Sequence, residues 1–156
     1  MEKTMTDQIM SPDNYVFETA LVKQTGYVLT ITLNRPEKKN AINDVMSNEI
    51  IYALTYAKQS DKIRAIKIQA NGDVFCAGGD LKNMWSKKDD SISSVPKLGD
   101  VEDISLLIRN LNKPVVCKIH GNVLAGALMI VCNATHAIAA SNVTFAAPEI
   151  KRGIWP

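Results

Sequence analysis

The sequence predicts a single α/β domain with stacked sheets and flanking helices. Short stretches with alternating apolar residues indicate strands, and longer stretches with apolar residues at helical spacing indicate helices. These stretches follow one another as strand, strand, helix, and the order repeats with variations but without a clean sequence repeat. A chain of 156 residues is long enough for one ordinary domain with a substantial core.

The first part of the chain begins with a polar stretch. Residues 1–14 are expected to form a flexible tail, so that the folded domain spans residues 15–156. Strands are predicted over residues 17–23 and 26–34. In the second strand Tyr27, Leu29, Ile31 and Leu33 fall on one face, and Val28, Thr30 and Thr32 fall on the other. This alternation predicts that the first of these faces is turned to the core.

A helix is predicted after the first two strands. Asn43 or Asp44 can cap its start, and apolar residues recur at helical spacing as far as residue 59. A buried strand over residues 64–70 follows. A glycine-bearing turn comes next, and Asp80 can begin a short helix after it.

The second half of the chain starts with a loop. Residues 86–100 are rich in Ser, Lys and Asp, which predicts a mobile cover or binding loop. The alternation of elements then resumes. The predicted elements are a helix over residues 101–112, a strand over 115–119, a helix apolar on nearly all sides over 124–132, and strands over 136–140 and 144–145.

The composition is that of a soluble globular protein, with 46% hydrophobic and 22% charged residues. The formal net charge of +2 is small, and no basic stripe alternates with aromatic residues, so nucleic-acid binding is not expected. The N-terminus lacks the apolar run of a signal peptide, and no stretch reaches the length of a membrane span. We therefore expect a cytoplasmic protein with no membrane partner.

The cysteines and histidines predict neither disulfides nor a metal centre. Cys76, Cys117 and Cys132 are widely spaced, form no CxxC pair and lie in apolar stretches. They are therefore expected to be small buried residues in a reducing compartment. His120 and His136 do not supply clustered ligands, so no metal site is expected.

Two glycine-bearing turns and one glutamate carry the chemical information. The first turn contains Gly78 and Gly79, the second contains Gly126, and Glu149 follows Pro148 further along. Each turn links a predicted strand to a predicted helix, where glycine lets a ligand approach free backbone N–H groups. Two such donors on one oxygen form an oxyanion hole, and a nearby carboxylate can move a proton, which suits chemistry on a thioester.

At these residues the chain resembles the crotonase family, also called the enoyl-CoA hydratase/isomerase family. The resemblance runs from about residue 15 to residue 156, which is nearly the whole chain. It rests on residues 34–41, 75–81 and 121–149, which occur in the family's order. It implies a crotonase-like spiral of repeated ββα units with stacked sheets. Members normally carry a further C-terminal helical region that closes the active site and makes trimer contacts. The resemblance thus implies a truncated core, and a homotrimer or hexamer in a full-length form.

The resemblance also assigns roles to the central residues. The N–H groups of Gly79 and Gly126 are expected to bind the thioester carbonyl, and Glu149 is expected to transfer a proton at the α or γ carbon. Gly126 lies near the start of a predicted helix, where unpaired N–H groups favour negative charge. The alternatives are two ordinary turn glycines, and a glutamate that starts a helix or pairs with Lys151 or Arg152.

The coenzyme A part of an acyl-CoA substrate is expected to contact the same loops. Lysines can meet its phosphates, although each lysine can equally be a solvated surface charge, and Asp80 can be a helix cap. No separate cofactor is expected. The expected CoA-binding residues are Lys38, Lys39, Ala41, Ala77, Gly78, Asp80 and Leu81, with Lys82 as a further candidate and Met84, Trp85 and Trp155 as candidates for the acyl tunnel.

One position departs from the family pattern. The ungapped match places the first catalytic glutamate of the family's hydratases at Met129, whose thioether can neither activate water nor donate a proton. One carboxylate suffices to move a proton between two carbons, so we expect enoyl-CoA isomerisation, or a decarboxylation or thioester hydrolysis. The alternatives are a hydratase with a non-standard water-activating group, and a non-catalytic CoA-thioester-binding subunit. Met129 can also simply pack in the core of a degenerate member.

Overall fold

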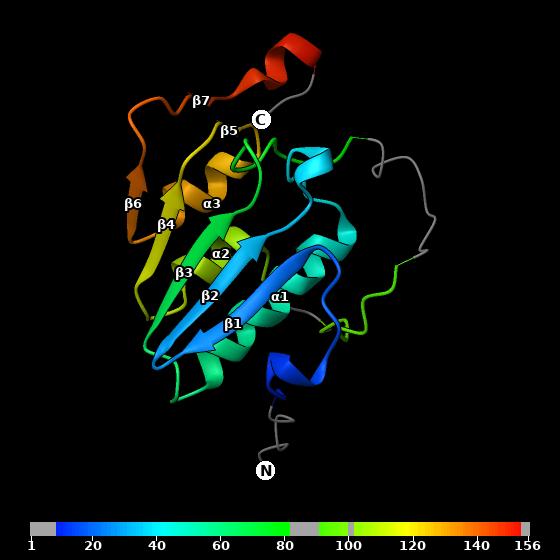
Figure 1. Cartoon of the computed structure of the whole chain (residues 1–156), viewed down its shortest axis with the longest axis vertical. Helices are drawn as coiled ribbons and strands as arrows, with labels where there is room; N and C mark the ends of the chain where they lie inside the picture. Colours follow the sequence, from blue (N-terminus) through cyan, green and yellow to red (C-terminus); the bar gives the residue numbers. More distant parts are fainter. Residues whose placement is uncertain (1–8, 82–90, 100–101, 154–156) are drawn as a thin grey trace, which may run out of the picture.

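The computed structural model describes residues 9–81, 91–99 and 102–153. Figure 1 shows one twisted sheet with helices against one of its faces and a second, smaller pair of strands beyond its upper edge. This arrangement confirms the predicted α/β class.

The α-helices in the described residues are α1 (Asp44–Gln59), α2 (Ile104–Arg109) and α3 (Ala127–Asn133). The strands are β1 (Ala20–Thr25), β2 (Val28–Leu33), β3 (Ala65–Ala70), β4 (Val115–Ile119), β5 (Val123–Leu124), β6 (His136–Ala139) and β7 (Phe145–Ala146). Among the described residues, the 3-10 helices are η1 (Pro12–Asn14), η2 (Pro36–Lys38) and η4 (Pro148–Arg152).

The large sheet has the order β1-β2-β3-β4-β6, and β5 pairs with β7 in the small one. β1 and β2 form an antiparallel hairpin, whereas β2, β3, β4 and β6 are parallel. The carboxyl ends of the parallel strands therefore meet at one edge of the sheet (Figure 1). Ligands of open α/β sheets bind at this kind of edge, and residues 34–43, 71–81 and 120–122 leave the sheet there.

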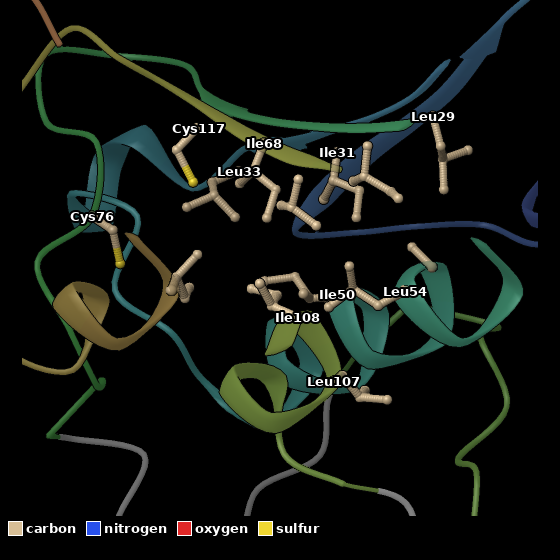
Figure 2. Close-up of a cluster of buried hydrophobic side chains, with 14 of the residues drawn as sticks. Leu29, Ile31, Leu33, Ile50, Leu54, Ile68, Cys76, Leu107, Ile108 and Cys117 are labelled. Carbon is tan, nitrogen blue, oxygen red and sulfur yellow. The ribbon is translucent and has the colours of Figure 1, made fainter. Parts of the chain in front are cut away.

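The core lies between the sheet and its helices. Figure 2 shows Leu29, Ile31 and Leu33 of β2 pointing from the sheet towards Ile50 and Leu54 of α1. All five side chains are at most 1% exposed. Leu29, Ile31 and Leu33 thus face the core as predicted. On the other face Val28 is 37% exposed, whereas Thr32 is only 6% exposed, so the burial does not alternate along the whole strand.

The predicted element boundaries hold best where a cap or a clear period fixes them. The helix predicted to end at residue 59 is α1, and Asn43 caps it, since its Oδ1 accepts a hydrogen bond from the Met46 N–H at 2.9 Å. The strand predicted over 115–119 is β4. The predicted helix over 101–112 is shorter, because Asp103 caps α2.

The structure fastens two segments that the sequence predicts to be loose. Residues 9–14 do not form a loose tail, because η1 begins at a buried Pro12 and the Tyr52 hydroxyl donates to the Met10 carbonyl at 3.0 Å. Residues 91–99, which belong to the predicted mobile cover or binding loop, are tied to the N-terminal segment. The Val16 N–H donates to Ser94 Oγ at 2.7 Å, and Val95 is buried. The rest of the predicted loop over 86–100 lies outside the described residues.

The helix predicted over residues 124–132 also differs. It begins at residue 127, because residues 123–124 pair with β7 instead. Only Ala127 and Ile130 of α3 are buried, so the helix is not covered on nearly all sides. Cys76 and Cys117 are buried as predicted, whereas Cys132 on α3 is exposed, which contradicts the expectation for that thiol.

The two buried thiols make stability depend on alkaline pH. Burial raises the pKa of Cys76 from its ordinary 9.0 to about 11 and that of Cys117 to about 12. Up to about pH 8 both thiols keep their protons in both states. Above pH 9 the unfolded chain loses these protons first. The free energy of unfolding should therefore fall between pH 9 and 12, by up to about 1.4 kcal/mol per pH unit for each thiol.

Urea unfolding at pH 7, 8, 9, 10 and 11 measures this effect. The midpoint should be nearly flat to pH 8 as far as these thiols are concerned, and should then decline. In Cys117→Ala the baseline stability is lower, but the decline above pH 9 should be shallower than in the parent chain. An equally steep decline in that variant would show that the Cys117 thiol does not contribute.

Candidate active site

The first glycine turn is held in place by the loop that follows β2. Ile42 and Gly79 form a parallel bridge, in which the Ile42 N–H donates to the Gly78 carbonyl and the Asp80 N–H donates to the Ile42 carbonyl, both at 2.8 Å. In a trans peptide the C=O and N–H groups point in opposite directions. The Gly79 N–H therefore points away from Ile42, and none of the described residues accepts it.

The second glycine turn runs alongside the first. The Leu124 N–H donates to the Cys76 carbonyl at 3.0 Å, and the Cys76 N–H donates to the Asn122 carbonyl at 3.2 Å. Ala125 has a φ of 55°, an unusual value for a residue with a side chain, and such backbone clusters at functional sites. The Ala125 carbonyl accepts from the Leu128 N–H at 2.9 Å, so the Gly126 N–H points out of α3, without a partner among the described residues.

The two turns touch beside these two N–H groups. A Cβ atom built on Gly78 would lie 2.6 Å from the Ala125 Cβ and 3.3 Å from the Gly126 nitrogen. The nitrogen of Gly126 is thus next to the residue that precedes Gly79. A Cβ atom on Gly79 or on Gly126 would meet nothing within 4 Å, so both glycines border open space. Two unpartnered donors on adjoining turns can together bind an oxygen atom that carries negative charge.

Glu149 lies shortly after the strand that supports the second turn. The Ala125 N–H donates to the Ala146 carbonyl at 2.9 Å, and Glu149 is three residues beyond Ala146, on η4. Its Oε2 is shielded from solvent and has no hydrogen-bond partner among the described residues. A buried carboxylate oxygen without a partner is rare in native proteins and calls for an explanation such as a role in chemistry.

Met129 is on α3, one turn after Gly126, and its N–H donates to the Gly126 carbonyl at 3.1 Å. The residue is 55% exposed. The interpretation that it merely packs in the core is therefore wrong. Its side chain is a thioether, which can neither take up nor donate a proton, on the exposed part of α3 that follows the second turn.

Some of the residues expected to bind coenzyme A are exposed to solvent, whereas others use their backbone N–H groups inside the protein. Lys38 and Lys39 are exposed, and the Lys39 carbonyl accepts from the Ala77 N–H at 3.0 Å, so this loop adjoins the first turn. The N–H groups of Ala77 and Asp80 are used inside the protein, so they cannot also serve a ligand as free donors. Leu81 is 39% exposed. Lys82, Met84, Trp85 and Trp155 lie outside the described residues.

Sequence reasoning missed two residues that shape the first turn. Asn40 is fully buried; its Oδ1 accepts from the Arg35 N–H at 2.8 Å, and its Nδ2 donates to the carbonyls of Asn71 and Val74. Arg35 donates from Nη1 and Nη2 to Oδ2 of Asp80, at 3.2 Å each. One signal in the sequence could have indicated this contact. Arg35 and Asp80 carry opposite charges, and each lies in a segment that follows one of two parallel strands.

Comparison with known proteins identifies the family. The model of the enoyl-CoA hydratase/isomerase family matches residues 23–156. The chain belongs to this family. The predicted membership of the crotonase family is therefore confirmed. Within the described residues, no group of three or more His, Cys, Asp or Glu could hold a metal ion, and no helix is long and apolar enough to cross a bilayer.

Curated relatives include both isomerases and hydratases. The chain is 35% identical over 142 residues to the trans-2-decenoyl-[acyl-carrier-protein] isomerase of Streptococcus mutans, which covers 90% of this chain and 54% of the relative. It is 34% identical over 133 residues to the mevalonyl-coenzyme A hydratase sidH of Aspergillus fumigatus, covering 83% and 47%. The chain thus spans about half the length of these relatives.

Solved structures of the family share the fold. An enoyl-CoA hydratase/isomerase from Pseudoalteromonas atlantica matches with a TM-score of 0.76 at 26% identity, covering 89% of this chain and 53% of that one. An enoyl-CoA hydratase from Mycobacterium smegmatis matches with a TM-score of 0.76 at 28% identity, covering 88% and 54%. These matches confirm the predicted crotonase-like fold.

Proposed function

We propose that the chain binds an acyl-CoA thioester with its carbonyl oxygen between the N–H groups of Gly79 and Gly126. The observation that carries this proposal is the contact between the two turns, where the Gly126 nitrogen lies 3.3 Å from a Cβ atom built on Gly78. Both donors lack partners among the described residues. A donor of this kind stabilises the transition state by roughly 3 kcal/mol, because charge grows on the oxygen as the enolate forms.

In the proposed reaction, Glu149 moves a proton along the acyl chain of a 3-enoyl-CoA. Its carboxylate takes a proton from the α carbon, and the electron pair of that C–H bond passes into an enolate whose oxygen the two amides hold. The enolate then collapses as the γ carbon takes up the proton, and the double bond moves from C3–C4 to C2–C3. The unpartnered Oε2 of Glu149 supports this role. The chemistry needs no metal and no redox cofactor.

Isomerisation is favoured over hydration because Met129 supplies no second acid or base. One relative with 35% identity is named an isomerase, which agrees with this choice. Hydration is the second candidate, since another relative is named a hydratase. It would require a water-activating group other than residue 129.

The variants Glu149→Gln and Gly126→Ala test the proposal. Each is incubated with a trans-3-enoyl-CoA, and the thioester absorbance and the products are followed. Glu149→Gln should lower kcat by a factor of about 10² to 10⁴. Gly126→Ala should lower it by about 10², because the added methyl group enters the proposed site and displaces the substrate, although the N–H group is kept. That variant should fold normally, since Gly126 has helical φ and ψ and the methyl group meets no protein atom.

Gly99→Ala is the matched control, because a Cβ atom at Gly99 also meets nothing within 4 Å. Equal turnover by Gly126→Ala and Gly99→Ala would rule out the oxyanion site. Binding of the thioester without turnover in the parent chain would favour a CoA-thioester-binding subunit. Net addition of water to a trans-2-enoyl-CoA at the rate of isomerisation would favour the hydratase.

A further inference from the structure

The ion pair between Arg35 and Asp80 joins two loops at the carboxyl edge of the sheet. Nη1 and Nη2 of Arg35 both donate to Oδ2 of Asp80, and Nη1 also donates to the Ala41 carbonyl at 2.5 Å. The two side chains are 14% and 17% exposed. The pair between Lys58 and Glu102 is far more open to solvent, at 39% and 38%. Shielding strengthens such charge-assisted hydrogen bonds.

The position of this pair matters because of the bridge beside it. Ala41 immediately precedes Ile42, and Asp80 immediately follows Gly79. The guanidinium group of Arg35 therefore connects the two chain segments that form the Ile42–Gly79 bridge. Its contacts lie next to the backbone hydrogen bonds of that bridge. Those hydrogen bonds set the orientation of the peptide between Gly78 and Gly79, and hence the direction of the Gly79 N–H.

We propose that Arg35 is a positioning residue, whose contacts with Asp80 and Ala41 hold the Gly79 N–H in the direction required to bind the thioester oxygen. The catalytic part of this inference rests on the proposed function, whereas the effect on the turn does not. A small change in the direction of an oxyanion donor weakens its hydrogen bond in the transition state, while the rest of the substrate is bound as before.

The backbone of Arg35 is itself fixed, which makes this connection rigid. Its N–H donates to Oδ1 of Asn40, and Nδ2 of the same fully buried Asn40 is anchored to two carbonyls at the start of the first turn. Asn40 adopts a φ of 52°, a conformation that asparagine tolerates better than most residues. The backbone of Arg35, through Asn40, and its guanidinium group, through Asp80, are therefore both held to the segment that leads from β3 to Asp80.

The first test needs no substrate. Amide hydrogen exchange is compared in the parent chain, Arg35→Gln, Arg35→Lys and Lys58→Gln. In Arg35→Gln the amides of Ile42 and Asp80 should exchange at least about tenfold faster, because their bridge opens locally. The amide of Ile66, which donates to the Pro114 carbonyl in the core, should not change. Arg35→Lys should give an intermediate rate, since it keeps the charge but not the planar fork.

The second test uses butyryl-CoA labelled with ¹³C at the thioester carbonyl as the probe. Hydrogen bonding to the amides should lower the infrared stretching frequency of the bound carbonyl in the parent chain. Arg35→Gln should lose a clear part of that shift, and the N–H of Gly126 should account for the part that remains. With a trans-3-enoyl-CoA, its kcat should fall at least about tenfold while KM changes less than about threefold, and Arg35→Lys should recover part of the loss. Lys58→Gln should match the parent in every reading.

The outcomes separate the two proposals. If the parent chain shows no carbonyl shift, the proposed function fails, and hydrogen exchange alone decides whether Arg35 holds the turn. If the parent shows the shift and Arg35→Gln retains both the shift and kcat, the positioning role is overturned. It is also overturned if the Ile42 and Asp80 amides exchange as in Lys58→Gln. Should Arg35→Gln fail to fold, Asp80→Asn, which keeps the shape of the partner, is read in the same way.

Discussion

Replacing Glu49 with alanine is expected to lower the free energy of unfolding by about 4 kcal/mol, one of the largest effects that a single substitution should have in this chain. Glu49 lies on α1 and is fully buried. Its Oε1 accepts from the Glu18 N–H at 2.6 Å. Its Oε2 accepts from the N–H groups of Thr19 and Ala20, both at 2.9 Å, and from the Thr19 hydroxyl at 2.6 Å. Alanine would leave these donors without an acceptor.

The carboxylate of Glu49 fixes the start of β1 on the long helix. β1 is an edge strand of the sheet, so its first residues lack a neighbouring strand on one side, and Glu49 supplies acceptors there. Glu49→Gln should cost less than alanine, about 2 kcal/mol, because one oxygen still accepts while the amide nitrogen faces donors.

Urea or thermal unfolding measures both variants. Glu102→Ala provides the control, since the Glu102 side chain is 38% exposed in its pair with Lys58, and it should change the free energy of unfolding by less than about 1 kcal/mol. A loss below about 1 kcal/mol in Glu49→Ala would mean that residues 18–20 are held in some other way.

The parts of the fold that could be predicted from the sequence are those fixed by local patterns. The cap at Asn43 and the apolar repeat after it determine α1, and strict alternation determines β2. By contrast, β5 and β7 have two residues each and pair across 22 positions. The apolar run that contains β5 looks like the beginning of a helix, and only its tertiary partner shows that it is a strand. Because nearly all residues of this run are apolar, the sequence also does not show that the side of α3 with Met129 is exposed.

The candidate site was only partly predictable for the same reason. Gly79, Gly126 and Glu149 belong to segments that the family resemblance marks, and the structure places the two glycine turns in contact. Arg35 and Asp80 are 45 positions apart. Their contact follows from the parallel pairing of β2 and β3, which aligns the loops after both strands. The composition of a polar loop likewise does not show which hydrogen bonds it makes, such as the one between the Val16 N–H and Ser94.

Gly121→Ala is expected to destabilise the chain by about 3 kcal/mol or more and to lower turnover with it. A Cβ atom at Gly121 would lie 2.2 Å from the Asp73 carbonyl oxygen, 2.9 Å from its carbon and 3.0 Å from the Val74 Cα. All three are backbone atoms, which cannot move aside as the end of a flexible side chain can. His120 Nε2 also lies 2.5 Å from the Gly72 carbonyl oxygen, so the two turns pack tightly here.

The clash should reach the proposed oxyanion site because Asn122 is part of the same turn. Its carbonyl accepts the Cys76 N–H, and Cys76 leads into Gly78 and Gly79. A shift of residues 120–122 therefore displaces the first glycine turn relative to the second. Unfolding midpoints and kcat are compared with Gly99→Ala, in which the added methyl group meets no protein atom. If Gly121→Ala unfolded at the same midpoint as that control, residues 73 and 121 could not be in backbone contact, and the close approach of the two turns that the oxyanion site requires would be lost with it.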